Sequence, residues 1–266
     1  MSKCVGLGRV IAVGLMACPT AAFAGAWTLD AGQGMAIVTG SPSQADKAFD
    51  GSGNLQSTPR YSKAELQALL EYGATDWFTV MLAPSLQHVA IAAPSEAQRD
   101  GLGYTDIGAR MRVSRGDSWV LSAQTTFRVP GTFDKSNAAA IGYTDPEVDV
   151  RGLLGYSFAA GAWPAFVDVQ AAQRFRIGGP PDEFRADVTF GLQPADRWLL
   201  LMQSFNVVSE GSGSWGYPSY AYYKLQLSAV YMLTPALSLQ AGGYTTYWGR
   251  NALQENGLVL GAWYKF

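Results

Sequence analysis

The chain has 266 residues, of which 48% are hydrophobic and 15% charged, and its formal net charge is −2 at pH 7. This balance argues against a nucleic-acid partner, because such proteins present a strongly basic face. High glycine, tyrosine and tryptophan content suits a membrane β-barrel and a soluble β-sandwich almost equally. The pattern along the chain therefore has to decide between them.

The first 24 residues have the layout of a secretory signal peptide. Lys3 and Arg9 form a basic start, an apolar stretch runs from Val10 to Ala17, and Ala22-Phe23-Ala24 is a small-x-small cleavage site. Cleavage there leaves residues 25–266 as the mature domain. Without Lys3 and Arg9 that domain has 17 basic and 21 acidic side chains, and it is more acidic than the precursor.

Both cysteines, Cys4 and Cys18, lie in the predicted signal peptide. The mature domain is therefore expected to have no disulfide and no cysteine metal site. An alternative cleavage box of the lipoprotein type occurs at Leu15-Met16-Ala17-Cys18, and its use would leave a lipidated Cys18 at the N-terminus.

Twelve strand-sized segments alternate polar and apolar residues with a period of two, which predicts strands with one polar face. In Tyr104–Val113, Arg110 and Arg112 fall on one face, and Ile107 and Met111 fall on the other. The predicted strands are Gln33–Ser41, Arg60–Tyr72, Phe78–Ala92, Tyr104–Val113, Trp119–Val129, Val148–Tyr156, Pro164–Ile177, Phe184–Leu192, Trp198–Val208, Tyr222–Tyr231, Leu237–Tyr247 and Asn256–Phe266.

The connections between these segments alternate between short turns and longer polar loops, as in outer-membrane barrels. The longer stretches are Pro42–Pro59, Pro94–Gly103, Pro130–Glu147, Gly178–Asp182, Ser209–Tyr220 and Trp248–Glu255. Within them, Asp46–Thr58 and Asp134–Asp145 are long enough to fold into a barrel as a plug. An even strand number places both termini in the periplasm.

Aromatic residues support the membrane interpretation. Trp77, Trp119, Trp163 and Trp198 each follow a short turn, as expected of a girdle at the membrane–water boundary. The C-terminal Phe266 is the signal expected for the barrel-assembly machinery. We therefore predict an all-β fold, a 12-stranded antiparallel transmembrane β-barrel in the outer membrane of a Gram-negative bacterium, in contact with its lipid and lipopolysaccharide. A soluble sandwich is the main alternative, and it would have shorter strands and a core face richer in valine, isoleucine and leucine.

Strand parity predicts a charged lumen. An arginine–carboxylate lattice there either stiffens the interior or lines a polar conduit whose arginine surplus favours anionic or hydroxyl-rich solutes. The predicted lumen-lining residues are Arg110, Arg112, Arg128, Arg151, Arg174, Arg176, Arg185, Asp106, Asp149, Asp168 and Asp187. A strongly apolar inward path is not apparent in the pattern.

An aromatic, glycine-rich stretch at residues 209–223 is predicted to form an outer loop. Its tyrosines suit an outer girdle, and Trp215 and Tyr217 are the candidates for ligand contact, for example by stacking on a sugar.

The sequence does not indicate an enzyme, a metal site or a cofactor. His88 is the single histidine and is predicted to face lipid near the outer end of its strand. Some outer-membrane lipid hydrolases place a histidine there, but Val89-Ala90 follows it in place of the His-x-Ser spacing that these enzymes show. Without a paired nucleophile, His88 is predicted to be an interface residue.

The N-terminal third resembles the XagA-like proteobacterial barrels associated with exopolysaccharide synthesis. Gly25-Ala26-Trp27-Thr28, the stretch 33–40 and Phe49-Asp50-Gly51-Ser52-Gly53 carry this resemblance. The hairpin Tyr72-Gly73-Ala74-Thr75-Asp76-Trp77 is similar, more loosely, to barrels named for the MetA pathway of phenol degradation. The resemblance implies an accessory or transport role near surface polysaccharide or aromatic solutes.

These observations predict a passive channel or accessory transporter for hydrophilic solutes, anionic or saccharide, with polysaccharide as a partner. A channel for aromatic or other hydrophobic compounds is the first alternative, because the second resemblance implies such solutes. A surface scaffold or adhesin that transports nothing is the next, and a lipid hydrolase is the least favoured.

Overall fold

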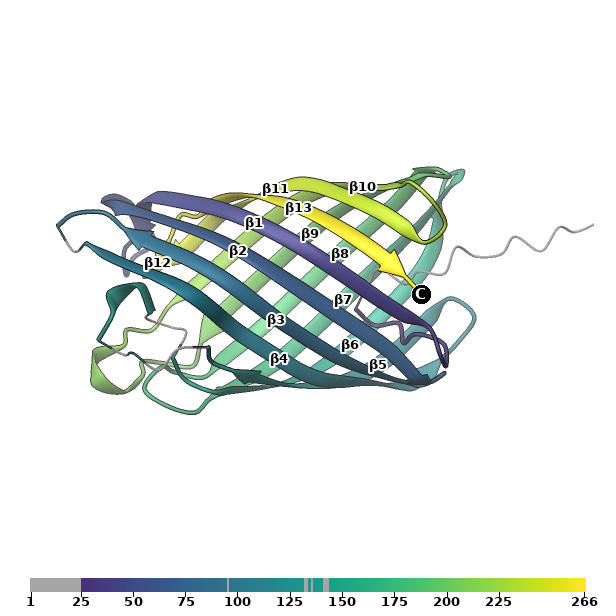
Figure 1. The fold of residues 1–266 in the computed structure, drawn as a ribbon, viewed down its shortest axis with the longest axis horizontal. Helices are drawn as coiled ribbons and strands as arrows, with labels where there is room; N and C mark the ends of the chain where they lie inside the picture. Colours follow the sequence, from purple (N-terminus) through teal and green to yellow (C-terminus); the bar gives the residue numbers. More distant parts are fainter. Residues whose placement is uncertain (1–24, 95, 132–133, 135, 141–143) are drawn as a thin grey trace, which may run out of the picture.

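The computed structural model describes residues 25–266 except 95, 132–133, 135 and 141–143. The predicted signal peptide, with Cys4 and Cys18, lies outside the described residues. The described chain forms a closed antiparallel barrel of twelve long strands, so the predicted fold is confirmed (Figure 1). The strands are β1 (Gly34–Phe49), β2 (Leu55–Thr75), β3 (Phe78–Ile91), β4 (Ala97–Arg115), β5 (Trp119–Val129), β6 (Glu147–Ala160), β7 (Trp163–Arg176), β8 (Glu183–Ala195), β9 (Trp198–Ser209), β10 (Ala221–Met232), β11 (Leu237–Arg250) and β13 (Asn256–Lys265), with β12 (Ala252–Leu253) as a two-residue addition.

The barrel closes because β1 pairs with β2 on one side and with β13 on the other. Gly34 donates its backbone N–H to the Phe266 carbonyl at 2.6 Å, so the first and last strands meet at one end of the barrel. We call this end the turn end, because the connections there are short: 76–77, 116–118, 161–162, 196–197 and 233–236. The opposite end is the loop end. Among the described residues no helix is both long and apolar enough to cross a membrane.

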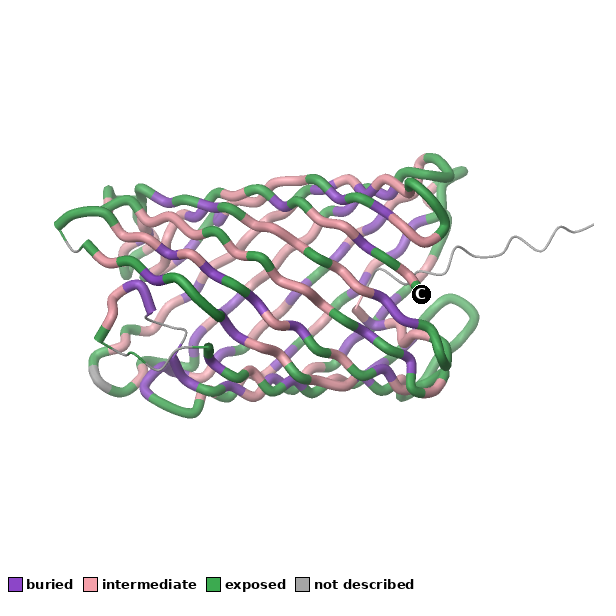
Figure 2. Tube along the Cα trace, in the orientation of Figure 1, coloured by how far each residue is buried: buried purple, intermediate pink, exposed green. Residues whose placement is uncertain are grey.

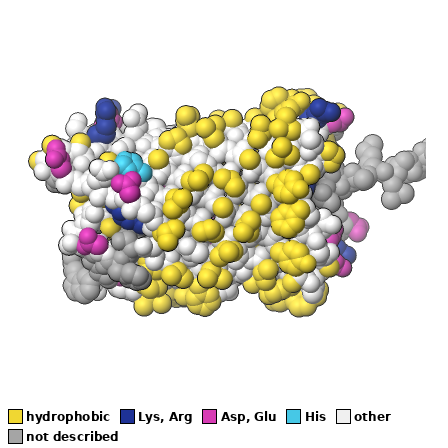
Figure 3. All heavy atoms as spheres, in the orientation of Figure 1, with side chains coloured by type: hydrophobic (Ala, Val, Ile, Leu, Met, Phe, Trp, Pro, Cys, Tyr) yellow, Lys and Arg dark blue, Asp and Glu magenta, His cyan; other side chains and the backbone are white. Residues whose placement is uncertain are grey.

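Buried and exposed residues alternate along most strands, as Figure 2 shows. On β4, Ile107 is 50% exposed whereas Arg110 is 6% exposed, so the apolar side chain faces outward and the charged one inward. On the face shown in Figure 3, apolar side chains cover the middle of the barrel and charged ones gather near its ends. A soluble protein has the opposite distribution, with apolar side chains inside and charged ones outside. An apolar outer surface of this kind is typical of a barrel embedded in lipid.

The outward aromatic residues lie near both ends of the barrel. Trp77, Trp119, Trp163 and Trp198 are exposed at the turn end, as the turn pattern predicted. At the loop end, Tyr223 stacks on Trp248, with ring centroids 5.0 Å apart. Such a pair of belts is typical of the two membrane–water boundaries.

The predicted loop Pro42–Pro59 is wrong. β1 continues to Phe49 and β2 begins at Leu55, so this stretch is a long hairpin that extends the barrel wall. Its turn is closed by Asp50, whose carboxylate accepts N–H bonds from Ser52 and Asn54 at 2.8 and 2.9 Å. These bonds hold the pKa of Asp50 below its ordinary value. The segment Asp46–Thr58 is therefore part of this hairpin and not a plug. Polar residues on both faces of the extension gave it the composition of a loop.

The β5–β6 loop packs over β4 at the loop end. It contains the 3-10 helix η1 (Ala138–Ala140), whose last two residues are buried. The Asn137 side chain donates a hydrogen bond to the Gln98 carbonyl at 3.0 Å. The hydroxyl of Tyr104, inside the barrel, donates to the Asp145 carbonyl at 2.7 Å. The described part of this loop therefore covers one side of the barrel mouth.

A charge on the outer surface should destabilise the barrel according to its depth. Val169 on β7 pairs with Leu154 on β6, and both side chains are exposed near the middle of the wall. We expect Val169→Arg to lower the unfolding free energy in phospholipid vesicles by about 2–4 kcal/mol. Leu233→Arg, in the turn after β10, is the control and should cost about 0–1 kcal/mol. Equal costs in urea titrations would contradict burial of this surface in lipid.

Candidate functional site: the luminal network and the N-terminal segment

Ion pairs cross the inner face of β2 and of β4 to β8. At their centre is Glu147 on β6, which is 3% exposed. Arg128 and Arg176 approach its carboxylate within 2.9 Å, and Arg174 lies 3.3 Å away. Three guanidinium groups thus share one carboxylate that has lost nearly all contact with water, an arrangement in which charge-assisted hydrogen bonds are strong.

Asp149 continues this cluster along β6. It pairs with Arg174 at 3.1 Å and with Arg151 at 3.2 Å, and Arg151 also contacts Asp187 on β8 at 2.6 Å. The further pairs are Arg110–Glu71 at 2.9 Å, Arg128–Asp106 at 2.9 Å and Arg185–Glu183 at 3.0 Å.

Two of the predicted lumen residues lie outside these pairs. Arg112 is near the turn end, and no ion pair joins it to the others within the described chain. Asp168 is fully buried, and its carboxylate accepts hydrogen bonds from the Ala26 N–H at 2.8 Å and from the Gln170 side chain at 2.5 Å. We call Asp168 and the paired residues the luminal network.

Within the luminal network the arginine surplus expected from the sequence is absent. Glu71, Glu147 and Glu183 join the network, and Arg112 does not. The network therefore contains six arginines and seven carboxylates. The sequence pattern places Glu147 in a loop and Glu183 just before a strand, although each shares the parity of the inward residues that follow it. Extending both strands to their first acidic residue, and counting Glu71 on the polar face of the second strand, would have revealed the balance. The members are Arg110, Arg128, Arg151, Arg174, Arg176, Arg185, Glu71, Asp106, Glu147, Asp149, Asp168, Glu183 and Asp187.

Residues 25–33, here called the luminal segment, fold back from the start of β1 into the turn end of the barrel. The Leu29 N–H donates to the Thr79 hydroxyl at 2.9 Å, and Thr79 is fully buried. The backbone of Leu29 and Asp30 lies so close to Gly73 that a Cβ there would overlap it. A glycine on β2 thus makes room for the segment to turn inward.

The tip of the luminal segment reaches the network. The Ala26 carbonyl accepts a hydrogen bond from Ser122 at 2.6 Å, and the Trp27 carbonyl accepts one from Arg110 at 3.0 Å. The Trp27 ring meets Phe166 edge-on, with centroids 5.9 Å apart. Sequence reasoning placed any plug in the outer loops and missed this segment. The only signal was a large aromatic residue just before the first strand.

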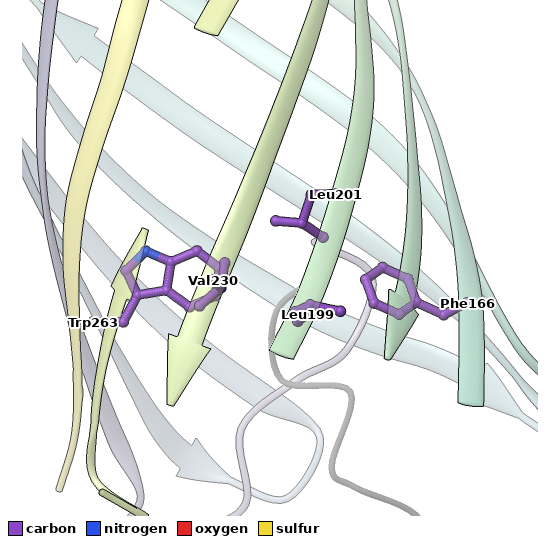
Figure 4. Close-up of a cluster of buried hydrophobic side chains, with 5 residues drawn as sticks. All are labelled: Phe166, Leu199, Leu201, Val230 and Trp263. Carbon is purple, nitrogen blue, oxygen red and sulfur yellow. The ribbon is translucent and has the colours of Figure 1, made fainter. Parts of the chain in front are cut away.

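An apolar cluster lines the other side of the lumen at the turn end (Figure 4). Phe166, Leu199, Leu201, Val230 and Trp263 are each at most 6% exposed, and they come from β7, β9, β10 and β13. The sequence pattern did not reveal this cluster. The inward residues of β9 alternate less cleanly in sequence, because both faces of this strand are largely apolar.

Further apolar residues face inward on β9 toward the loop end, beyond the polar Gln203. Val207 pairs in register with Arg185, and Phe205 pairs with Asp187. Val207 is fully buried. Charged and apolar side chains therefore stand on adjacent strands along much of the lumen.

A second charged cluster lies on the opposite wall near the loop end. Glu255 accepts hydrogen bonds from Ser43 at 2.6 Å and from Tyr244 at 3.2 Å, and it pairs with Lys224. Ser43 and Tyr244 also line a cavity of about 760 Å³ in the barrel wall, whose other lining residues include the outward Leu227 and Leu258.

The aromatic outer loop sends one of its tyrosines into the lumen. Tyr220 donates a hydrogen bond to Glu183 at 2.5 Å and accepts one from Arg176 at 3.0 Å. The predicted contact residue Tyr217 closes the 3-10 helix η2 (Ser214–Gly216), which contains the backbone of Trp215. Tyr217 does not join the network in the hydrogen bonds and ion pairs of the described residues.

His88 points outward at the loop end of β3. Its Nδ1 lies 2.6 Å from Asp100 on β4, and both side chains are exposed to solvent. A histidine–carboxylate pair orients an imidazole, but hydrolysis by this route also needs an activated hydroxyl. Among the hydrogen bonds of the described residues, none joins His88 to a serine or threonine hydroxyl. The described residues also contain no cluster of three or more histidine, cysteine or acidic side chains arranged to hold a metal.

No protein-family model matches the chain, and no curated protein matches it in sequence. Among solved structures, the chain is similar to the COG4313 outer membrane channel from Pseudomonas putida F1, with a TM-score of 0.75 and 16% identity over 91% of this chain and 98% of that one.

Two porins are more distant. NanC gives a TM-score of 0.51 at 9% identity over 87% of this chain and all of that one. KdgM, solved in complex with disordered oligogalacturonate, gives 0.50 at 9% identity over 87% of this chain and 99% of that one. At these identities the likeness establishes the fold, that of outer-membrane β-barrels.

Proposed function

We propose that the chain is an outer-membrane channel for small amphipathic solutes that carry an apolar or aromatic body and a charged or hydroxylated group. The proposal rests on one observation: one side of the lumen is lined by charged side chains and the other by apolar ones. A balanced network of arginines and carboxylates occupies β2 and β4 to β8. Apolar side chains line the turn end and, on either side of Gln203, the inner face of β9. The turn end faces the periplasm, in keeping with the short turns and with Phe266 beside β1.

The charge balance favours amphipathic solutes over purely anionic ones. Arginines held by carboxylates on several sides are already neutralised, so the lumen offers an anion little net attraction. A purely hydrophobic solute would have to lie against charged side chains with which it forms no hydrogen bond, which is costly. A solute with both parts is able to place its apolar body along Leu201 and Phe205 while its polar group contacts Asp187 or Arg185 on the neighbouring strand.

A saccharide channel is the second candidate. Arginine side chains hydrogen-bond carboxylates and hydroxyls, and the KdgM porin, of similar fold, has been solved with oligogalacturonate. The resemblance of the N-terminal third to XagA-like barrels points in the same direction, toward exopolysaccharide. The two candidates differ in one respect: an amphipathic solute needs the apolar side chains of β9 and of the turn end, and a saccharide does not.

Liposome swelling separates them. We expect benzoate or a phenolic acid to enter proteoliposomes faster than a sugar acid of similar mass. Replacing Leu201 with Asn should slow the aromatic acid and leave the sugar acid unchanged, because the substitution removes apolar contact without altering charge. Leu200→Asn is the matched control, because Leu200 faces outward. Faster entry of the sugar acid, unaffected by Leu201→Asn, would favour the saccharide channel. If neither solute enters, a surface scaffold becomes the better interpretation.

A further inference from the structure

Asp168 differs from every other carboxylate of the luminal network. The other six each have an arginine nitrogen within 4.0 Å, and Asp168 has no such cation among the described residues. It is fully buried, and its hydrogen-bond partners are an amide N–H and an amide side chain. Arg110 and Arg151 act on Asp168 only from beyond contact distance. A buried carboxylate without a directly paired cation is unfavourable, so the position favours a further cation.

The luminal segment brings its first described residue to this carboxylate. Gly25 precedes Ala26, whose N–H donates to Asp168 at 2.8 Å. Successive backbone nitrogens are about 3–4 Å apart, so the Gly25 nitrogen lies within about 6–7 Å of the same oxygen. A Cβ at Gly25 would overlap the Gln170 side chain, which also donates to Asp168. The end of the segment therefore occupies the same compartment as the unpaired carboxylate.

We propose that Asp168 is the binding site for the α-ammonium group that signal-peptide cleavage creates at Gly25. In the uncleaved chain the Gly25 nitrogen is an uncharged peptide amide. Hydrolysis of the Ala24–Gly25 bond adds water across it, leaving a carboxylate on Ala24 and an amine on Gly25 that is protonated near neutral pH. The new cation completes the one unpaired position in the network. Cleavage after Ala24 thereby anchors the luminal segment in the barrel.

Small residues at this point are consistent with the arrangement. Ala26, whose N–H donates to the carboxylate, is fully buried, and Gly25 directly precedes it. A larger side chain at position 25 would displace Gln170 or Leu153. A terminus that began several residues earlier would carry its charge away from Asp168.

Selective acylation of the α-amine tests the proposal on the protein purified from outer membranes. Intact mass should show that the chain begins at Gly25. Near neutral pH, acetic anhydride should acylate this amine about tenfold more slowly in the wild type than in Asp168→Asn, because acylation needs the unprotonated, accessible amine. Peptide mass spectrometry measures the rate, with the exposed Lys47 as an internal reference. Asp196→Asn, at an exposed turn, should leave the rate unchanged.

An insertion of one alanine directly after Ala24 gives a second variant in which Asp168 is intact. It moves the ammonium group by one residue, and its amine should acylate faster than that of the wild type. This variant decides the matter if Asp168→Asn fails to fold. A mature chain that begins elsewhere, for instance at a lipidated Cys18, overturns the proposal, and so do equal acylation rates in the wild type and the insertion variant. No solute is involved, so the result is independent of the channel proposal.

Discussion

Glu147→Gln should lower the unfolding free energy by about 3–5 kcal/mol, the cost of breaking a buried ion pair from one side. The carboxylate contacts Arg128, Arg174 and Arg176, and the amide that replaces it carries no charge. The three guanidinium groups would then repel one another with only peripheral carboxylates to offset them. The loss is to be measured by urea titration in phospholipid vesicles, with heat-modifiable gel migration as the test of folding.

Asp117→Asn is the control for this substitution. Asp117 lies in the exposed turn between β4 and β5, where a single charge is worth little. A loss below about 1 kcal/mol for Glu147→Gln, similar to that of an exposed pair, would show that water fills the lumen around Glu147 and screens the network. The lumen would then be wider than the packed side chains indicate.

Gly155→Val should open the barrel at the turn end. Gly155 faces inward on β6, and a Cβ at this position would overlap the Trp27 ring. The valine side chain would therefore displace the tip of the luminal segment from its position between Phe166 and β6. We expect single-channel conductance in planar bilayers to rise by about twofold or more, because pore width governs the passage of ions.

Gly152→Val provides the matched control. Gly152 lies three residues away on the same strand and faces outward, and a Cβ there meets nothing within 4 Å. Its conductance should match the wild type. If both variants conduct equally, the luminal segment is not the constriction, and the luminal network itself becomes the narrowest point.

Strand parity was informative wherever a strand has one polar and one apolar face. On β4, the placement of Arg110 inward and Ile107 outward follows directly from a period of two. Parity failed where both faces have the same character. Both faces of β9 are largely apolar, so the inward position of Leu201 was not apparent, and both faces of the β1–β2 extension are polar, so it resembled a loop.

The sequence by itself determined the barrel: the number of strands, the outward aromatic belts and the side of the wall on which most charges lie. These are local properties, because the two faces of a strand meet different solvents and the chain has to match each of them. Only the tertiary structure decided what fills the lumen. The balance of arginines and carboxylates depends on partners that are far apart in sequence, such as Glu71 and Arg110. The luminal segment has no periodic pattern at all. Its place is set by contacts with Ser122, Asp168 and Phe166, which closure of the barrel brings together.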